Sequence, residues 1–289
     1  MMMKNAVFNQ LAHARRYFEA KAATYDTEAH GSYERLTDVL LSEALNLSVF
    51  PRLPDKFTFL DVGGGTGRWS ARIATTCQES SGVLLDVSAG MVRHAEERAR
   101  SHGYLDRVRH IRGDVDQAGA LLAGMRFDLI INTHHLLGFF HSPELVLGSL
   151  VPLLSDHGLL VSVMPSRWHA AYGDLSVGDA DRARKSLSGL SWEANEKPYG
   201  HLFTPGEVRM LHLSAKLTVD LLTGFPCLIY PTPLGAASPS LRSAEELLRD
   251  ETFFRKVLAM EIELLIDPDA GSRGANLLAV ASRRKPSGD

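Results

Sequence analysis

Cysteine is scarce in this sequence. Only Cys77 and Cys227 occur among 289 residues, and neither belongs to a Cys-x-x-Cys pair or to a His/Cys ligand spacing. This scarcity argues against a disulfide framework and against a structural zinc site. It also fits a reducing compartment, and we expect a cytoplasmic protein.

Long apolar runs and an excess of basic charge are also lacking. No stretch approaches the roughly 18 consecutive apolar residues of a membrane span, and the first residues do not form the apolar core of a signal peptide. The formal net charge is −3, and the only dense basic run is 283–285. The sequence therefore predicts no membrane association and no DNA binding, and it carries no general signal for nucleic acid.

What the sequence has in abundance is apolar residues in short, regularly spaced runs. Hydrophobic residues make up 45% of the chain, enough for a large core. Such runs alternate with helical stretches, a pattern typical of parallel strands covered on both faces. We predict an α/β fold with a doubly wound, Rossmann-like sheet of seven strands, whose ligands bind at the carboxyl ends of the strands. The predicted strands are 57–62, 82–85, 108–111, 127–131, 158–164, 217–222 and 276–281.

The other segments indicate how the chain is organised around this sheet. Residues 1–56 are predicted to form a helical N-terminal cap, and 57–164 the α/β core. Residues 165–203, which contain several aromatic residues and glycines, are predicted to form an inserted lid, and 204–289 to complete the sheet. Helices are predicted over most of 4–50 and over 67–77, 89–102, 143–154, 204–214 and 243–266.

A glycine-rich loop follows the first predicted strand. Residues 61–67 read Asp-Val-Gly-Gly-Gly-Thr-Gly. Glycines at this place allow a tight turn into the next helix and a close approach of a ligand. The dinucleotide-binding pattern Gly-x-Gly-x-x-Gly does not fit, because its last glycine would fall on Arg68 counted from Gly63, or on Ser70 counted from Gly65. The spacing Asp-x-Gly-x-Gly-x-Gly instead resembles motif I of class I S-adenosylmethionine-dependent methyltransferases.

Four further segments follow in the order found in that family. Asp86 ends the second predicted strand, where a carboxylate can accept both ribose hydroxyls of the donor. Asp114 follows the third strand, where the resemblance implies contact with the adenine amino group. Residues 127–137 resemble the fourth strand and the loop beneath the donor. Residues 153–161 resemble the turn Leu-x-Pro-Gly-Gly-x-Leu, although Asp-His-Gly stands here in place of Pro-Gly-Gly.

The resemblance implies an S-adenosylmethionine-dependent methyltransferase that binds S-adenosyl-L-methionine and releases S-adenosyl-L-homocysteine. We expect no metal, because the local acidic pair Asp114 and Asp116 is better explained by adenine contact. The donor-binding residues that the resemblance implies are Tyr25, Asp61, Gly63, Gly65, Gly67, Asp86, Val87, Met91, Asp114, Val115, Asn132 and His134.

A narrower resemblance bears on the methyl acceptor. The triple glycine, the segment 21–25 and the stretch 258–263 are similar to the tRNA wobble carboxymethoxyuridine methyltransferases and their relatives. Where that group would hold Arg-Tyr for the wobble carboxylate, this chain has Ala275-Asn276. We therefore favour transfer to O or N of a small molecule over transfer to tRNA. A donor-binding regulatory protein without turnover is the alternative from another class, and a homodimer is compatible with each of these functions.

Catalytic candidates are few, because methyl transfer from a sulfonium relies on orientation and exclusion of water. A general base is needed only for a protonated nucleophile. His135, on the loop after the fourth strand, is a candidate base, and His201, just before the helix that starts at 204, is a candidate for substrate contact. A packing role is the plain alternative for both. Weaker candidates around the acceptor are Arg68, His141, Arg167, Trp168, His169, Trp192 and Tyr199.

Overall fold

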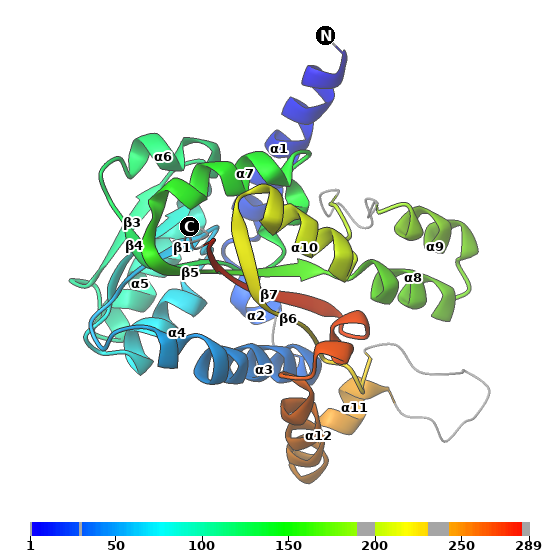
Figure 1. Ribbon diagram of the computed structural model, residues 1–289. Coiled ribbons are helices and arrows are strands. Elements are labelled where there is room, and N and C mark those ends of the chain that lie inside the picture. The colour runs from blue at the N-terminus through cyan, green and yellow to red at the C-terminus, as the bar shows by residue number, and fades with distance from the viewer. Residues whose placement is uncertain (1, 29–30, 190–199, 231–242, 285–289) are drawn as a thin grey trace, which may run out of the picture.

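A seven-stranded sheet forms the centre of the protein in a computed structural model that describes residues 2–28, 31–189, 200–230 and 243–284 (Figure 1). The strand order is β3-β2-β1-β4-β5-β7-β6. β1 to β5 pair in parallel, whereas β7 runs antiparallel to β5 and β6. The predicted α/β, Rossmann-like sheet is thereby confirmed. The strands are β1 (Thr58–Val62), β2 (Ser81–Asp86), β3 (Val108–Arg112), β4 (Phe127–Asn132), β5 (Leu154–Pro165), β6 (Leu217–Phe225) and β7 (Asn276–Arg283).

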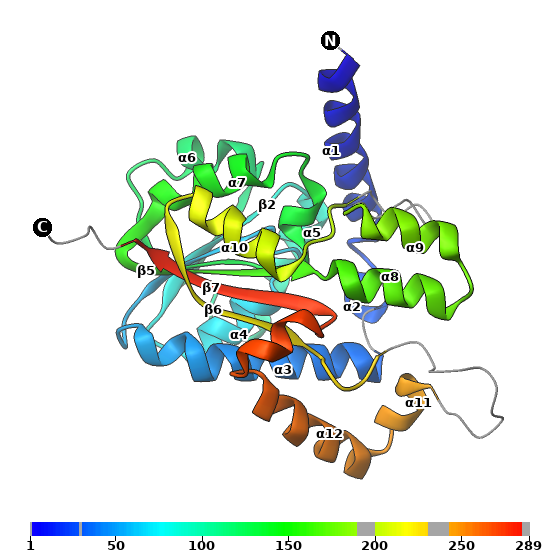
Figure 2. The same ribbon diagram turned by 45° about the vertical axis from the view of Figure 1, so that its right-hand side comes forward.

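Helices cover both faces of the sheet. The α-helices are α1 (Met2–Lys21), α2 (Tyr25–Glu28), α3 (Ser32–Ser48), α4 (Arg68–Thr76), α5 (Ala89–Ser101), α6 (Ala118–Leu121), α7 (Pro143–Leu150), α8 (Arg167–Ser176), α9 (Ala180–Leu187), α10 (Pro205–Ser214), α11 (Ala244–Leu248) and α12 (Glu251–Leu264). Figures 1 and 2 show α6, α7 and α10 on one side of the sheet and α3, α4 and α12 on the other. Short 3₁₀ turns lie at η1 (Phe50–Arg52), η2 (Val115–Gln117), η3 (Leu136–Phe139), η4 (Val151–Leu153) and η5 (Pro268–Ser272).

The core is divided by the sheet because successive strand residues point to opposite faces. In β1, Phe59 packs with α3, α4 and α5, whereas its neighbour Leu60 packs with α6 and α7. Leu129 and Ile130 of β4 alternate in the same way. Burial on both faces explains why these strands read as continuous apolar runs in the sequence.

Two predicted helices differ from the observed ones. The single helix predicted over 243–266 is wrong: α11 ends at Leu248 and α12 starts at Glu251, because the Asp250 side chain accepts a hydrogen bond from the Phe253 amide at 2.7 Å and begins a new helix. The helix predicted over 143–154 ends at Leu150. Pro152 lies in the following 3₁₀ turn, since proline disfavours the interior of an α-helix, and β5 begins at 154 instead of 158.

The segment predicted as an inserted lid contains α8 and α9, which lie side by side in both views (Figures 1 and 2). Trp168 on α8 is 45% exposed. Trp192 and Tyr199 lie outside the described residues. Among the helices that the structure describes, none is both long and apolar enough to cross a membrane.

A buried carboxylate holds the chain that follows β6. Glu261 of α12 is 1% exposed and accepts hydrogen bonds from three successive backbone amides: those of Cys227 and Leu228 at 2.7 Å and that of Ile229 at 3.3 Å. These three residues belong to no strand or helix, so Glu261 replaces the partners that such an element would supply.

We expect Glu261→Ala to destabilise the fold by about 2–4 kcal/mol, because three buried N–H groups lose their acceptor. Glu263→Ala is the matched control, since Glu263 lies on the same helix and is exposed. Urea unfolding of wild type and of both variants measures the change in the free energy of unfolding. Equal unfolding free energies for the two variants would contradict the role of Glu261.

Candidate active site

A cleft opens at the carboxyl ends of β1 to β4. The chain runs outward from β1 through β2 to β3, and β4 lies on the other side of β1, so the segments after β1 and β4 diverge. The cleft contains about 910 Å³ of space, part of it open to solvent. Its lining residues are Ala14, Arg15, Phe18, Tyr25, Gly63, Gly64, Gly65, Thr66, Arg68, Leu85, Asp86, Val87, Met91, Gly113, Asp114, Val115, Thr133, His134, Leu136, Phe139 and Phe140.

Three glycines of the loop after β1 have positive φ angles, 64° at Gly63, 54° at Gly65 and 76° at Gly67. A side chain at Gly63 would meet Leu136, and one at Gly67 would meet Ala95. A side chain at Gly65 would have only the Met91 sulfur within 4 Å, at 3.9 Å, because this position faces the cleft. Gly63 and Gly67 therefore permit packing, whereas Gly65 keeps space for a ligand.

Asp86 connects the ends of β1 and β2. One carboxylate oxygen accepts the Gly65 amide at 2.9 Å, and the other accepts the Ser88 amide at 2.8 Å. Burial raises the pKa of this carboxyl group, while the two amides act in the opposite direction. Each oxygen of a carboxylate has a second lone pair, so Asp86 can still accept two hydroxyl groups from the cleft.

Asp61 lies beneath the loop instead of in the cleft lining. It is 0% exposed, and one of its oxygens accepts the Ser70 amide at 3.1 Å and the Ser70 hydroxyl at 2.7 Å. These bonds fix the loop to the start of α4. Burial raises the pKa of Asp61 to about 7.

The N-terminal helices form one wall of the cleft. The Glu19 carboxylate accepts the Ser88 hydroxyl at 2.6 Å and the Gly90 amide at 3.2 Å, at the start of α5. Arg15 forms an ion pair with Asp114. The cleft lining thereby includes Ala14, Arg15, Phe18 and Tyr25, which lie above the strand ends.

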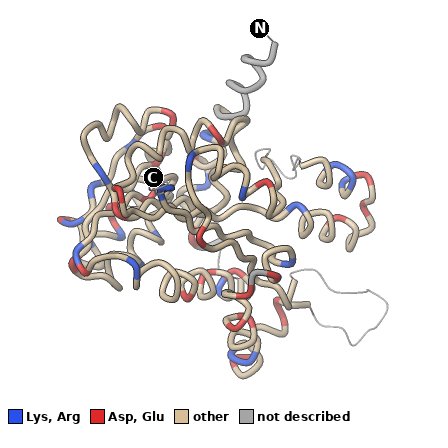
Figure 3. The backbone as a smooth tube through the Cα atoms, viewed as in Figure 1, with Lys and Arg blue, Asp and Glu red and all other residues tan. Residues whose placement is uncertain are grey.

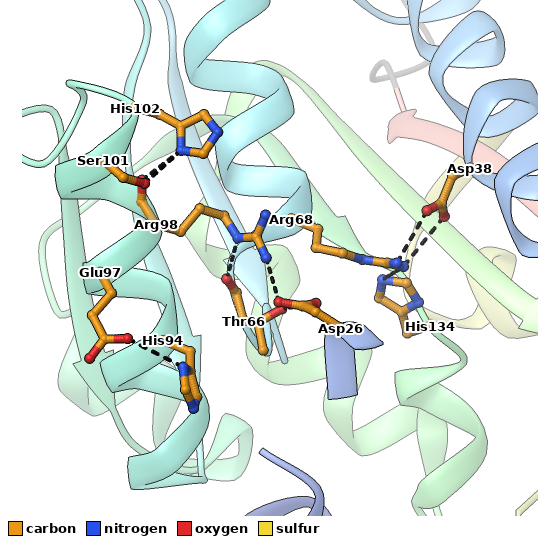
Figure 4. Close-up of polar contacts among 10 residues, drawn as sticks. All are labelled: Asp26, Asp38, Thr66, Arg68, His94, Glu97, Arg98, Ser101, His102 and His134. Atoms are coloured by element: carbon orange, nitrogen blue, oxygen red, sulfur yellow. Dashed lines mark hydrogen bonds and ion pairs between the residues drawn. The ribbon is translucent and has the colours of Figure 1, made fainter. Parts of the chain in front are cut away.

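Helix α2 is held over the glycine loop by Asp26. Its carboxylate accepts the Thr66 hydroxyl at 2.8 Å and pairs with Arg98 of α5, while Arg98 also donates to the Thr66 carbonyl at 2.9 Å (Figure 4). Two charged side chains from separate elements thus converge on Thr66, directly after Gly65.

Arg68 and His134 meet at one end of the cleft. Figure 4 shows the Arg68 guanidinium between the Asp38 carboxylate, 3.2 Å away, and the His134 ring, whose Nε2 lies 3.4 Å away. The indole N–H of Trp69 donates to the same Nε2 at 3.1 Å. Burial and the Arg68 charge lower the pKa of His134 to about 3, so this ring is neutral in the physiological range.

His135 turns to the opposite side of the loop. Its Nε2 lies 2.7 Å from Oδ1 of Asn276, at the start of β7. Burial lowers the pKa of His135, and the hydrogen bond to Asn276 acts in the opposite direction. His201 lies beside His141 and Phe203, with ring centroids 6.2 and 6.3 Å apart, and its amide donates to the Gly138 carbonyl at 2.7 Å.

The structure brings most of the predicted donor residues together. The lining includes Tyr25, Gly63, Gly65, Asp86, Val87, Met91, Asp114, Val115 and His134. Asp61, Gly67 and Asn132 are outside the lining, and so are the catalytic candidates His135 and His201. The Asn132 amide donates to the Val161 carbonyl and the Ser162 hydroxyl, so it serves the pairing of β4 with β5.

Some residues that line the cleft, both apolar and polar, were not predicted from the sequence. Phe18 of α1 packs edge-on against Phe139, with ring centroids 5.3 Å apart. The buried Thr133 hydroxyl oxygen has no hydrogen-bond partner in the part of the chain that the structure describes. These residues belong to no local motif, because their role arises only when α1 and the loop after β4 meet. Within the same described part, no three His, Cys, Asp or Glu side chains gather as a metal site.

Comparison with known proteins agrees with this geometry. Residues 59–158 match a family model described as a methyltransferase domain. A search of curated proteins finds no match.

Solved structures with the same fold include methyltransferases of several kinds. The mitomycin 7-O-methyltransferase MmcR has a TM-score of 0.50 and 16% identity over 85% of this chain, which spans only 54% of MmcR. The methyltransferase in a complex with the Haloferax volcanii activator Trm112 has a TM-score of 0.57 and 16% identity, with coverage of 96% and 100%. The plantazolicin methyltransferase BamL, solved with S-adenosylhomocysteine, has a TM-score of 0.55 and 16% identity, with coverage of 98% and 99%.

The fold and the glycine loop are those of a class I methyltransferase domain. The chain thus contains a methyltransferase domain at 59–158, within the fold that S-adenosylmethionine-dependent methyltransferases share.

The buried Asp61 predicts a pH-dependent effect of Asp61→Asn, which keeps an acceptor for Ser70 and removes the buried charge. Because the folded pKa is raised to about 7, the stability that Asp61 contributes is present at low pH and lost as pH rises through about 7. We expect the variant to gain stability relative to wild type as pH rises from about 5 to about 8, by on the order of 2 kcal/mol.

Urea unfolding at several pH values measures this difference. Asp61→Ala is the control, because it removes both the charge and the acceptor, and it should be less stable than the asparagine variant throughout. If the difference in unfolding free energy between wild type and Asp61→Asn does not change with pH, the raised pKa of Asp61 is contradicted.

Proposed function

We propose that the protein transfers a methyl group from S-adenosylmethionine to an oxygen or nitrogen atom of a small-molecule acceptor. The observation that carries this proposal is the cleft itself, which α1 and α2 partly cover and which has apolar sides at Phe18, Leu136 and Phe139. A partly covered apolar cleft suits a small acceptor, because a polynucleotide needs an open and basic surface.

The residues of the cleft fit the donor. The free lone pairs of Asp86 suit the two ribose hydroxyls, and the empty space at Gly65 suits the amino-acid end of the donor. Asp114 and Val115 follow β3, where the resemblance implies the adenine. When bound, the donor supplies a methyl group on a positively charged sulfur. We propose that the donor site consists of the predicted donor residues that line the cleft. Thr133 and Arg68 also line the cleft, and we add them to this site.

The chain contributes orientation and exclusion of water around the reacting atoms. Phe18, Phe139 and Tyr25 cover the donor end of the cleft. Of the two catalytic candidates, we propose His135 as the general base, because it stands between the cleft residues His134 and Leu136 in the sequence and burial lowers its pKa. His201 stays a candidate for acceptor contact.

Charge on the surface supports a small acceptor over tRNA. In Figure 3, lysine and arginine are interspersed with aspartate and glutamate along the described backbone. Asn276, at the position where the tRNA wobble enzymes are expected to hold an arginine-tyrosine pair, is already bonded to His135. A regulatory protein that binds the donor without turnover predicts the same donor affinity and no product with any acceptor.

We expect Asp86→Ala to weaken binding of S-adenosylhomocysteine by on the order of tenfold to a hundredfold, because charge-assisted hydrogen bonds to the ribose are lost. Isothermal titration calorimetry measures the affinity, and NAD serves as the parallel ligand that should not bind. Wild-type affinity in Asp86→Ala would show that the ribose is bound elsewhere.

Gly65→Val tests the space at the amino-acid end of the donor. We expect a large loss of affinity for S-adenosylhomocysteine, since the added side chain projects into the cleft. Gly124→Val is the matched control: Gly124 also has a positive φ, 80°, but it lies away from the cleft with open space around it. Equal affinity in the two variants would contradict the proposed position of the donor.

A further inference from the structure

The two adjacent histidines after β4 have opposite kinds of hydrogen-bond partner: donors surround His134, and an acceptor faces His135. We propose that His134 and His135 are held in opposite neutral tautomers, that Asn276 is the positioning residue for His135, and that Nδ1 of His135 is the imidazole nitrogen able to take a proton from the acceptor. The assignment of the protons follows from the hydrogen-bond partners, and the base role rests on the proposed methyl transfer.

The tautomer of His134 is set by two donors. The Trp69 indole nitrogen, 3.1 Å from Nε2, can only donate a hydrogen bond. The Arg68 guanidinium, 3.4 Å from the same atom, is also a donor without acceptor capacity. Nε2 of His134 must therefore be the unprotonated nitrogen, and in the neutral ring the proton lies on Nδ1. The lone pair of His134 is already in use, so this ring is a poor base.

The tautomer of His135 is set by an acceptor. Nδ2 of Asn276 donates to the Phe225 carbonyl at 3.1 Å, and a carbonyl can only accept. This contact fixes the orientation of the Asn276 amide, so that its Oδ1 faces Nε2 of His135 at 2.7 Å. Nε2 of His135 must then carry the proton, and Nδ1 retains a free lone pair.

The backbone at the two histidines has an unusual conformation that holds the two rings apart. His134 and His135 both have positive φ angles, 54° and 64°, a conformation that residues other than glycine rarely adopt. Two such residues in sequence cost conformational energy that the surrounding contacts must offset. The result directs one ring to α4, through Trp69, and the next ring to β7, through Asn276.

The tautomers indicate which acceptors the site serves. A free Nδ1 is useful for a nucleophile that arrives with its proton, a hydroxyl or an N–H group, whereas a carboxylate needs no base. The acceptor atom forms its bond to the methyl carbon as the carbon–sulfur bond breaks, and that electron pair stays on the donor sulfur. The proton released by the acceptor goes to Nδ1 of His135.

Nuclear magnetic resonance of the full chain labelled with ¹⁵N-histidine tests the proposal directly. The two-bond and three-bond couplings distinguish a protonated from an unprotonated ring nitrogen, and His134→Gln and His135→Gln assign the two signals. We expect the proton on Nδ1 in His134 and on Nε2 in His135. The reverse assignment for either ring in the wild-type protein would overturn the proposal.

Matched variants separate positioning from simple packing. Trp69→Phe should change only the His134 signal, and Asn276→Leu should change only the His135 signal, moving it to a mixture of tautomers. Asn276→Asp keeps an acceptor oxygen and should restore the form with the proton on Nε2, even if the leucine variant does not fold. An unchanged His135 signal in folded Asn276→Leu, or a tautomer mixture in Asn276→Asp, would overturn the role of Asn276.

Donor affinity is measured separately on the same samples by titration with S-adenosylhomocysteine. Wild-type tautomers as proposed together with absent donor binding would overturn the proposed function alone. Normal donor binding with the wrong tautomers would overturn this inference alone.

Discussion

The carboxylate of Asp86 joins two turns that the chain builds far apart in sequence. By accepting the amides of Gly65 and Ser88, it fixes the distance between the loop after β1 and the start of α5. Both turns lead into a helix and contribute residues to the cleft lining, among them Gly65 and Val87, so the site depends on their relative position. A neutral side chain with a single acceptor atom could not satisfy both amides, which is why a buried charge at this place is tolerated.

The rest of the cleft is made by elements that do not belong to the sheet. Glu19, Arg15 and Asp26 connect the first two helices to α5, to the turn after β3 and to Thr66. These contacts are polar and partly exposed, whereas the helices on the sheet faces are held by apolar packing. The sheet provides a rigid base, and the N-terminal helices provide a wall held by fewer and weaker interactions.

The fold and the donor loop were predictable from sequence because both depend on local patterns. Burial on two faces produces continuous apolar runs, and the close approach of a ligand at Gly65 requires glycine. The partners of the histidines were not predictable, because Asn276 and His135 are 141 positions apart and meet only through the antiparallel pairing of β7. The break between α11 and α12 was missed since Asp250 reads equally well as a residue on an exposed helix face.

The ion pairs that hold the N-terminal wall have a kinetic consequence. Arg15 with Asp114 and Arg98 with Asp26 are partly accessible to solvent, so dissolved ions weaken their attraction. The helices that these ion pairs hold cover part of the cleft and so help to retain a ligand bound beneath them. The residence time of the demethylated product is therefore expected to shorten as ionic strength rises, even though the ligand contacts within the cleft are unchanged.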